Sequence, residues 1–180
     1  MGRYVNELSR AMHWMGEHPL VKIIGQSTVW DGHALFKTWK NVAIEKRMEL
    51  PVFEDFQMGM TIGIAMQGWI PVSIYPRMDF LIVATNQLTN HLANMRLISD
   101  GKYKRHTIIR TTIGATRPMY SGLQHSQDHT ESLRLLSRDE IDVVTLHTPE
   151  EVFPAYEYAL MREDRKPTIL IEYSDLYNED

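Results

Sequence analysis

The sequence contains no cysteine. Disulfide bonds, thiol nucleophiles and zinc sites built on cysteine are therefore excluded. No apolar run reaches the ~20 residues that a membrane-spanning helix needs, and the residues after Met1 lack the apolar stretch of a signal peptide. The net charge of −4, with histidine neutral, gives no indication of a nucleic-acid-binding surface. We therefore expect a cytoplasmic protein that binds neither nucleic acid nor membrane.

The length and composition fit a single folded domain over residues 1–180. A chain of 180 residues can bury a sizeable core, and its 43% hydrophobic and 23% charged residues are typical of globular proteins. No glycine-rich phosphate loop follows an expected strand, so a general nucleotide-binding domain is a weak interpretation.

Short apolar segments alternate with segments of helical spacing along the chain. We expect strands at 21–25, 70–75, 106–111, 141–146 and 168–172, and a further strand ending near Val52 and Phe53. We expect helices at 8–15, 58–67, 80–97 and 149–162, and a loop at 113–127. Segment 35–46 fits a polar helix or an irregular loop, and 173–180 reads as an acidic tail. The alternation predicts a three-layer α/β fold, a mainly parallel sheet with helices on both faces.

Several polar residues follow the expected strands directly. In open parallel sheets, ligands bind beyond the carboxyl ends of the strands. We therefore expect a site at that edge, made by residues that include Glu54, Tyr75, Thr111 and the loop containing His125.

The segment from Pro51 to Gly68 is the most informative part of the chain. Glu54 and Asp55 are its only charged residues, and they precede an apolar segment that carries glycines four residues apart. A carboxylate just before a helix is stabilised by the helix dipole, and glycines at this spacing let a backbone or a flat ring approach the helix. The pattern predicts an acid at the mouth of a tightly packed apolar site, although a lone glutamate at a helix start is usually a capping or solvated group.

The spacing of this segment resembles that of the pyrimidine-binding domain of thiamine-diphosphate enzymes. Within the transketolase group, the sequence is most similar to the beta subunit of the 2-oxo-acid dehydrogenase first component. The matching positions lie in order along nearly the whole chain: Glu54, Gly59, Gly63, Ala65, Gly68, Trp69 to Val72, Asp79 and Phe80, Asn86 and Gln87, Gln124 to Gln127, and Pro167 to Glu172.

The resemblance implies roles for four residues around the cofactor. Glu54 would hydrogen-bond the aminopyrimidine ring of thiamine diphosphate and share a proton with its nitrogen, which promotes deprotonation of the thiazolium carbon. Phe80 would stack on the same ring. Val52 and Val83 would form apolar walls, although they are equally well explained as core residues, as an aromatic residue at a helix start usually is. Asp55 and Met78 depart from the commonest residues at their positions.

A histidine in a polar loop is usually just exposed. The resemblance places His125 at the mouth of the active site, where it would orient or protonate the substrate or an acyl acceptor. His129 lies four residues further on and could share a helix face with it. A zinc site at this pair is a poor interpretation, because no third ligand is in view.

Other features of the family are missing from this sequence. We find no Gly-Asp-Gly motif of the kind that binds the diphosphate and Mg²⁺, and Gln26-Ser27 replaces the acidic pair after the first strand. We also expect this protein to lack the C-terminal domain of such beta subunits. We therefore expect half a site, completed by a partner chain that carries the diphosphate-binding domain and holds Mg²⁺.

The sequence thus predicts a subunit of a thiamine-diphosphate-dependent enzyme that acts on a small-molecule 2-oxo acid or ketose. Decarboxylation, oxidative acyl transfer and ketol transfer all remain open. We expect a hetero-oligomer or a homo-oligomer. The alternative is a non-catalytic relic, or a regulatory assembly domain with the same fold.

Overall fold

A computed structural model describes residues 2–103 and 106–178. Six strands form one sheet in the order β2-β1-β3-β4-β6-β5, and every neighbouring pair is parallel. The strands are β1 (Val21–Gly25), β2 (Arg47–Glu49), β3 (Ile70–Tyr75), β4 (Ile108–Ile113), β5 (Asp142–Leu146) and β6 (Thr168–Tyr173). The predicted α/β fold with a parallel sheet is confirmed.

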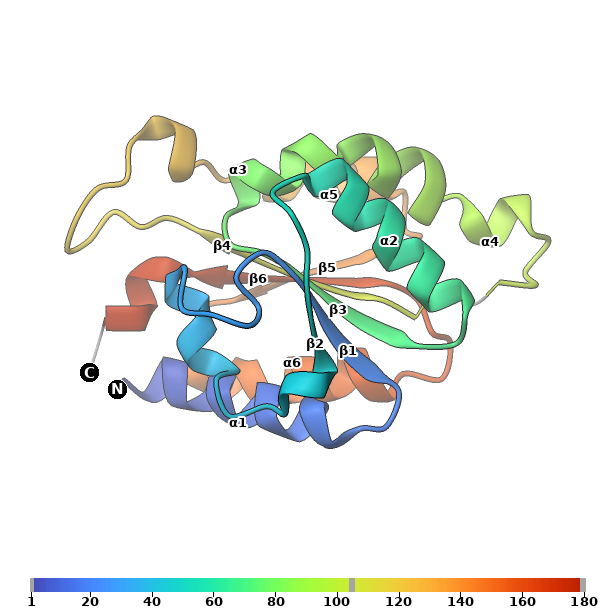
Figure 1. Ribbon diagram of the computed structural model, residues 1–180. Helices are drawn as coiled ribbons and strands as arrows, with labels where there is room; N and C mark the ends of the chain where they lie inside the picture. Colours follow the sequence, from blue (N-terminus) through green and yellow to red (C-terminus); the bar gives the residue numbers. More distant parts are fainter. Residues whose placement is uncertain (1, 104–105, 179–180) are drawn as a thin grey trace.

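Helices cover both faces of this sheet, as Figure 1 shows. The α-helices are α1 (Arg3–Glu17), α2 (Glu54–Met66), α3 (Met78–Leu81), α4 (Met95–Ile98), α5 (Thr130–Ser137) and α6 (Pro149–Met161). The layer of α1 and α6 lies on one face, and α2, α3 and α5 lie on the other (Figure 1). The short helices are η1 (Ala34–Thr38), η2 (Ile44–Lys46), η3 (Ile82–Ala84), η5 (Leu123–His125), η6 (Ser174–Asn178) and the π-helical η4 (Gln87–Leu92). The predicted three layers are therefore confirmed.

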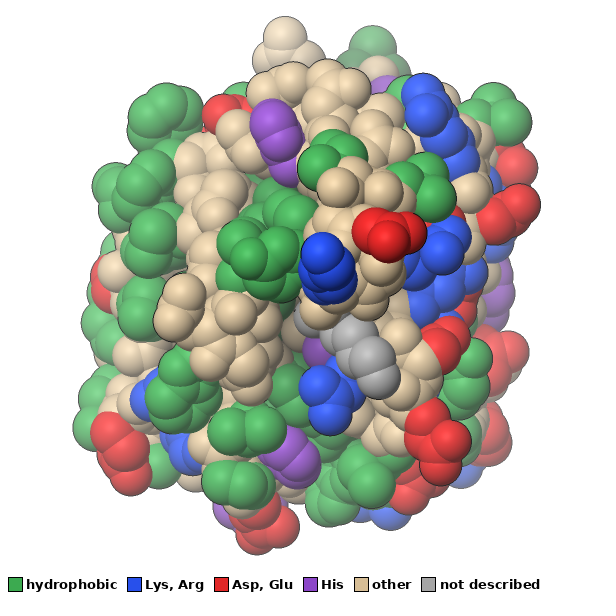
Figure 2. Space-filling model, turned by 90° about the vertical axis from the view of Figure 1, so that its right-hand side faces the viewer, with side chains coloured by type: hydrophobic (Ala, Val, Ile, Leu, Met, Phe, Trp, Pro, Cys, Tyr) green, Lys and Arg blue, Asp and Glu red, His purple; other side chains and the backbone are tan. Residues whose placement is uncertain are grey.

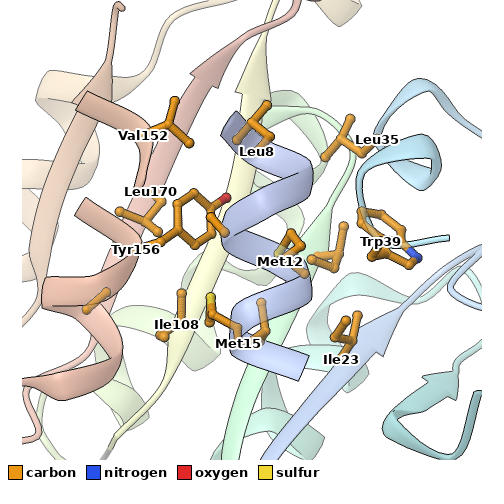
Figure 3. Close-up of a cluster of buried hydrophobic side chains, with 14 of the residues drawn as sticks. Leu8, Met12, Met15, Ile23, Leu35, Trp39, Ile108, Val152, Tyr156 and Leu170 are labelled. Carbon is orange, nitrogen blue, oxygen red and sulfur yellow. The ribbon is translucent and has the colours of Figure 1, made fainter. Parts of the chain in front are cut away.

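The core under α1 and α6 follows from helical spacing in the sequence. Leu8, Met12 and Met15 lie on one face of α1 and are fully buried. They pack in one cluster with Trp39 and Tyr156, and Figure 3 shows these side chains converging around α1. Burying each large apolar side chain contributes roughly 1.5–3 kcal/mol, so this face fixes α1 on the sheet.

The strands of the sheet's centre are buried on both faces. All six residues of β3 are buried, and five of the six residues in both β4 and β6 are buried. Strands covered on both faces lack the polar alternation of half-exposed strands and appear in the sequence as continuous apolar runs. This is why β1, β3 and β6 could be predicted.

Helix α6 begins as the sequence predicts. Thr148 is its N-cap, and the Glu151 carboxylate accepts the backbone N–H of Thr148 at 3.2 Å, which completes a capping box. The glycine expected to end an earlier helix is also confirmed in its conformation. Gly68 follows α2 with φ of +88°, a backbone conformation that favours glycine.

The structure corrects several expected boundaries. The strand predicted to end at Val52 and Phe53 is instead β2, and both of those residues are exposed. Because β2 is a three-residue edge strand with two charged residues, no apolar run marked it. Helix α2 begins at Glu54 rather than Met58, and β4 lies two residues later than predicted.

The predicted helix at 80–97 is not a regular α-helix. The path is helical, with Leu81, Leu88 and Leu92 buried, but it passes through α3, η3, η4 and α4 in turn. The side-chain amide of Asn94 donates to the Thr89 carbonyl oxygen at 3.2 Å, a side-chain contact that competes with regular backbone bonding. Helix α5 was not predicted, because its buried residues are Leu133 and two polar ones.

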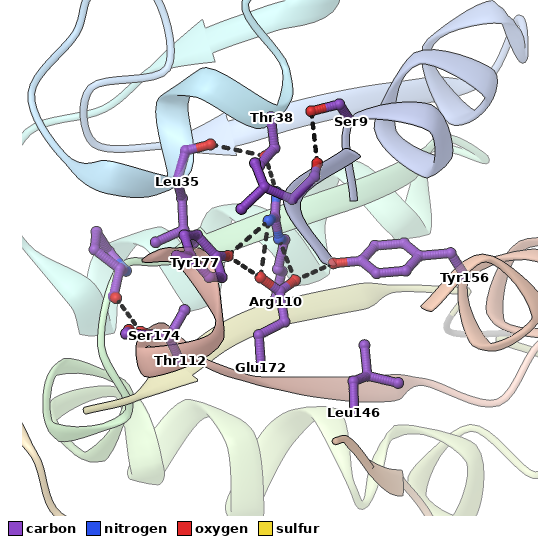
Figure 4. Close-up of polar contacts among 12 residues, drawn as sticks. Ser9, Leu35, Thr38, Arg110, Thr112, Leu146, Tyr156, Glu172, Ser174 and Tyr177 are labelled. Atoms are coloured by element: carbon purple, nitrogen blue, oxygen red, sulfur yellow. Dashed lines mark hydrogen bonds and ion pairs between the residues drawn. The ribbon is translucent and has the colours of Figure 1, made fainter. Parts of the chain in front are cut away.

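The end of the described chain is not a simple acidic tail. It forms η6, in which Tyr177 is buried. Figure 4 shows the Tyr177 hydroxyl beside Arg110 and Glu172, a pair of charged side chains that are both 0% exposed. Because the Tyr4 and Tyr177 rings also lie 6.0 Å apart, η6 packs against the start of α1.

Candidate functional site

The carboxylate of Glu54 lies at the carboxyl edge of the sheet. Gln26 directly follows β1, and its Nε2 donates to Oε1 of Glu54 at 2.9 Å. Tyr75 ends β3, and its buried hydroxyl donates to the backbone oxygen of Glu54 at 3.4 Å. Burial raises the pKa of Tyr75, so its hydroxyl keeps the proton that it donates. Two neighbouring strands thus place Glu54, and its Oε2 has no hydrogen-bond partner within the described residues.

The loop after β1 is held by Glu49 and His33. The Glu49 carboxylate accepts the backbone N–H groups of Ser27 and Thr28, each at 2.6 Å. The His33 Nε2 donates to the Gln26 carbonyl oxygen at 3.1 Å. Burial lowers the pKa of His33, which therefore stays neutral with its proton on Nε2. These contacts fix the backbone from which Gln26 reaches Glu54.

Helix α2 is anchored to β3 by buried polar side chains. Gln57 Nε2 donates to the Ile74 carbonyl oxygen at 2.8 Å and to Ser73 Oγ at 3.1 Å. The hydroxyl groups of Thr61 and Ser73 are hydrogen-bonded to each other at 2.9 Å. At Gly25, where φ is +149°, an added Cβ would lie 2.7 Å from the Ile74 carbonyl oxygen. The start of α2, and with it Glu54, is therefore held close to the ends of β1 and β3.

An open groove of about 620 Å³ runs along the outer side of α2. Its walls are largely apolar and aromatic, with a polar contact between Gln87 Nε2 and Asp55 Oδ2 at 3.4 Å. The lining residues are Phe53, Asp55, Phe56, Gly59, Met60, Gly63, Ile64, Gln67, Trp69 and Gln87. A Cβ added at Gly63 would meet no described atom within 4 Å. The glycines thus leave the backbone of α2 open to contact from outside.

Phe80 and His125 lie together, although they are 45 residues apart in the sequence. Their rings are in edge-to-face contact, with centroids 5.7 Å apart and planes at 87°. Phe80 comes from α3, which follows β3, and His125 ends η5 in the loop after β4. Both are half-buried. The edge of the sheet therefore brings together two of the residues that the sequence singled out.

Val52 and Val83 lie outside the core. Val52 is 76% exposed and Val83 is 58% exposed, so the interpretation of either residue as core is wrong. Phe80 is only half-buried, so it is not a core residue either. The predicted role of all three residues as cofactor contacts stays a prediction.

His129 lies directly before α5, where it is the N-cap residue. Its backbone N–H donates to Met78 Sδ at 2.9 Å, at the start of α5. Over residues 2–103 and 106–178, no three histidine, cysteine, aspartate or glutamate side chains are grouped so that they could hold a metal ion. In the same ranges, no helix is long and apolar enough to cross a membrane. The cytoplasmic location stays a prediction.

The sequence predicts Tyr75 at this edge, but sequence reasoning missed Gln57 and Arg77. Gln57 looked like one more polar residue of a helix. Arg77 donates to the His125 carbonyl oxygen at 3.1 Å. A lone basic residue two positions after a buried strand was the available signal for Arg77.

Known proteins are similar to this chain in sequence and in fold. Residues 13–179 match the family described as transketolase, pyrimidine binding domain. A pyruvate dehydrogenase E1 component subunit beta-4, chloroplastic, from Oryza sativa subsp. japonica is 30% identical over 168 residues, which cover 91% of this chain and 40% of the relative. A subunit beta-3, chloroplastic, from Arabidopsis thaliana is 31% identical with the same two coverages. The chain thus spans less than half the length of these relatives.

A solved structure extends the comparison to the fold. A split gene transketolase, in an inactive beta4 tetramer, superposes with a TM-score of 0.65 at 16% sequence identity. The superposition covers 93% of this chain and 50% of the other. At this identity the likeness concerns the fold alone.

Proposed function

Because this chain belongs to the family of transketolase pyrimidine-binding domains, we propose that it is a subunit of a thiamine-diphosphate-dependent enzyme. Its substrate would be a 2-oxo acid or a ketose. The observation that carries the proposal is Glu54, held at the carboxyl edge of the sheet by Gln26 and Tyr75 with one carboxylate oxygen unpartnered in the described structure.

The residues at this edge fit an aminopyrimidine ring. Such a ring needs a hydrogen-bond partner for its nitrogen and apolar or aromatic contacts for its faces. Glu54 Oε2 offers the first, and the half-buried ring of Phe80, with the exposed Val52 and Val83, offers the second. Thiamine diphosphate, when bound, supplies a carbon nucleophile that attacks a carbonyl group.

The chain's own residues would then handle protons and orientation. Glu54 would hold a proton on the ring nitrogen, and Gln26 would keep the carboxylate aimed by donating to its other oxygen. His125, held against Phe80, would orient the substrate or transfer a proton to it. Both roles require groups fixed in place before the substrate binds. The hydrogen bonds of Glu54 to Gln26 and Tyr75 support this for the first role.

We further propose that a partner chain supplies the diphosphate-binding domain and Mg²⁺. The described residues show no group of side chains suited to a metal ion. The groove along α2 is exposed and largely apolar, and exposed apolar patches of this kind mark interfaces. The open backbone at Gly59 and Gly63 would let a helix of another chain pack closely there.

One observation favours the alternative of a non-catalytic relic or regulatory assembly domain. Gln26-Ser27 stands where the family resemblance leads us to expect an acidic pair, and Gln26 contacts the Glu54 carboxylate directly. If this contact disables Glu54, the fold and the α2 groove would serve assembly alone.

The test is Glu54→Gln in the complex that this chain would form with the proposed diphosphate-domain chain. Exchange of the thiazolium proton with deuterium and turnover should both fall by roughly 10²–10⁴-fold, because the amide cannot hold the ring proton. Cofactor affinity should change little, because the partner would supply the diphosphate and metal contacts.

Asp55→Asn is the matched control, because Asp55 is the adjacent carboxylate in the first turn of α2 and contacts Gln87 instead. It should leave exchange and turnover within about twofold of wild type, as a residue outside proton transfer does. If Glu54→Gln behaves like Asp55→Asn, Glu54 is only a carboxylate at a helix start and the assembly domain becomes the better interpretation.

A further inference from the structure

Arg77 lies at the junction of two elements that carry site residues. It follows β3 and is the N-cap of α3, where its carbonyl oxygen accepts the backbone N–H of Phe80 at 3.1 Å. Phe80 is three residues further on and in the same short helix. The backbone of Arg77 is therefore part of the rigid unit that holds the Phe80 ring.

The side chain of Arg77 reaches the loop between β4 and η5. Its Nη1 donates to the His125 carbonyl oxygen at 3.1 Å and also to the Gly114 carbonyl oxygen. Gly114 directly follows β4, and His125 is the last residue of η5. One guanidinium nitrogen thus bridges the two ends of segment 114–125.

Arg77 makes no ion pair with any carboxylate in the described structure. The hydrogen bonds of its guanidinium group go to these two backbone carbonyl oxygens. Charged donors make stronger hydrogen bonds than neutral ones, and the planar guanidinium group holds its donors in a fixed geometry. Such a group is suited to fixing two carbonyl groups relative to each other.

Other contacts order the same segment without linking it to Phe80. The Ser121 hydroxyl donates to the His125 carbonyl oxygen at 3.3 Å, within the segment itself. The Asp175 carboxylate accepts the backbone N–H groups of Thr116 and Arg117 at 2.7 and 2.9 Å, which ties the segment to η6. Arg77 links the two ends of the segment to the helix of Phe80, and just beyond the segment Gln127 Nε2 donates to Asp79 Oδ1 of the same helix at 3.0 Å.

We propose that Arg77 is a positioning residue, which fixes the His125 ring against Phe80 by holding both ends of segment 114–125. The inference rests on the proposed function, because the chemical role of His125 belongs to that proposal. Without the guanidinium group, the His125 backbone would lose its hydrogen bond to Arg77. This end of the segment would then be tied to α3 through residues beyond it, such as Gln127 at Asp79, so the ring contact at 5.7 Å would be held less firmly.

The first test measures geometry in the chain itself and does not depend on activity. In Arg77→Met, chymotrypsin should cleave after Tyr120, which is 53% exposed, on the order of tenfold faster, because the segment opens more often. The imidazole NMR signals of His125, identified by their loss in His125→Ala, should move toward those of free histidine. Arg96→Met removes an arginine from an ion pair with Glu140 elsewhere on the surface and should change neither readout.

The second test separates positioning from a general structural role by a double-mutant cycle in the complex. Arg77→Met should lower turnover by on the order of 10²-fold in the wild-type background, because a small displacement of a reacting group has this effect. In the His125→Ala background, Arg77→Met should cause no further loss of turnover. The rate of thiazolium exchange should stay within about twofold of wild type in both backgrounds. Arg77→Lys should restore part of the turnover, because an ammonium group keeps the positive charge and its donors but lacks the planar, fixed geometry of the guanidinium group.

Each outcome decides the proposal. Equal losses in the two backgrounds, or slowed thiazolium exchange, would assign Arg77 a general structural role and overturn it. Unchanged cleavage and unchanged His125 signals would overturn it as well. If instead Glu54→Gln leaves exchange intact, the proposed function fails, while cleavage and NMR still decide whether Arg77 holds His125.

Discussion

Replacing Glu172 by glutamine should destabilise this chain more than any surface charge change. Glu172 and Arg110 form an ion pair in which both side chains are 0% exposed. Arg110 Nη2 donates to Glu172 Oε2 at 2.8 Å, and Nε donates to the other carboxylate oxygen. The hydroxyls of Tyr156 and Tyr177 donate to the same carboxylate, as Figure 4 shows. Glu172 therefore balances a charge that water cannot reach.

The magnitude follows from what Arg110 would lose. Burial alone lowers the pKa of Arg110, and the Glu172 carboxylate more than offsets this and raises it above its ordinary value, so the guanidinium stays charged. In Glu172→Gln that charge keeps its bond to Thr38 Oγ1 at 2.7 Å but loses its counter-ion. Breaking a buried pair from one side costs about 3–5 kcal/mol. This is a large share of the roughly 5–15 kcal/mol by which a typical domain is stable.

Urea unfolding at pH 7, followed by circular dichroism, measures this cost directly. Glu150→Gln is the control, because Glu150 pairs with Arg3 at 2.6 Å in a contact whose side chains are 63% and 77% exposed. It should cost less than about 1 kcal/mol, as exposed pairs do. Glu172→Gln could also lower the free energy of unfolding by less than about 1 kcal/mol, with an unchanged dependence on urea concentration. That result would refute the idea that Arg110 needs Glu172 as its counter-ion in a site without water.

Three further predictions concern ligands, assembly and pH. Calorimetric titration of thiamine diphosphate and Mg²⁺ into the chain alone should show weak or no binding. Sub-micromolar affinity would contradict the proposal that a partner chain completes the cofactor site. Gly63→Leu should leave the isolated fold stable, because space above Gly63 is open, yet weaken any self-association or partner binding seen by sedimentation. Sedimentation as a strict monomer with no recoverable partner would count against the α2 groove as an interface. Burial lowers the pKa of both His33 and His106, so the folded chain binds fewer protons than the unfolded one. Stability should therefore fall as pH drops below about 6.5, by up to about 1.4 kcal/mol per pH unit for each histidine. His106→Gln should flatten that slope in unfolding curves, and an unchanged slope would show that His106 titrates normally.

Features that depend on neighbours in the chain could be predicted from the sequence. The apolar runs of β1, β3 and β6 mark strands buried on both faces, and the capping pattern at Thr148 marks the start of α6. The segment from Glu54 to Gly68 also belongs here, because an acid at a helix start and a glycine after its end are local signals. Together these determined the α/β class and the residue on which the proposed chemistry depends.

The remaining features are contacts between distant residues, which only the tertiary structure decided. Arg110 and Glu172 are 62 positions apart, and Arg77 reaches His125 over 48 positions. Periodicity reports whether a residue faces the core, but it does not say which partner it meets there. Strand order and register decide which residues come into contact. Strand β4 lies between β3 and β6, and this places Arg110 beside Glu172. The same packing brings the loop after β4 to Arg77, because parallel strands end at one edge of the sheet.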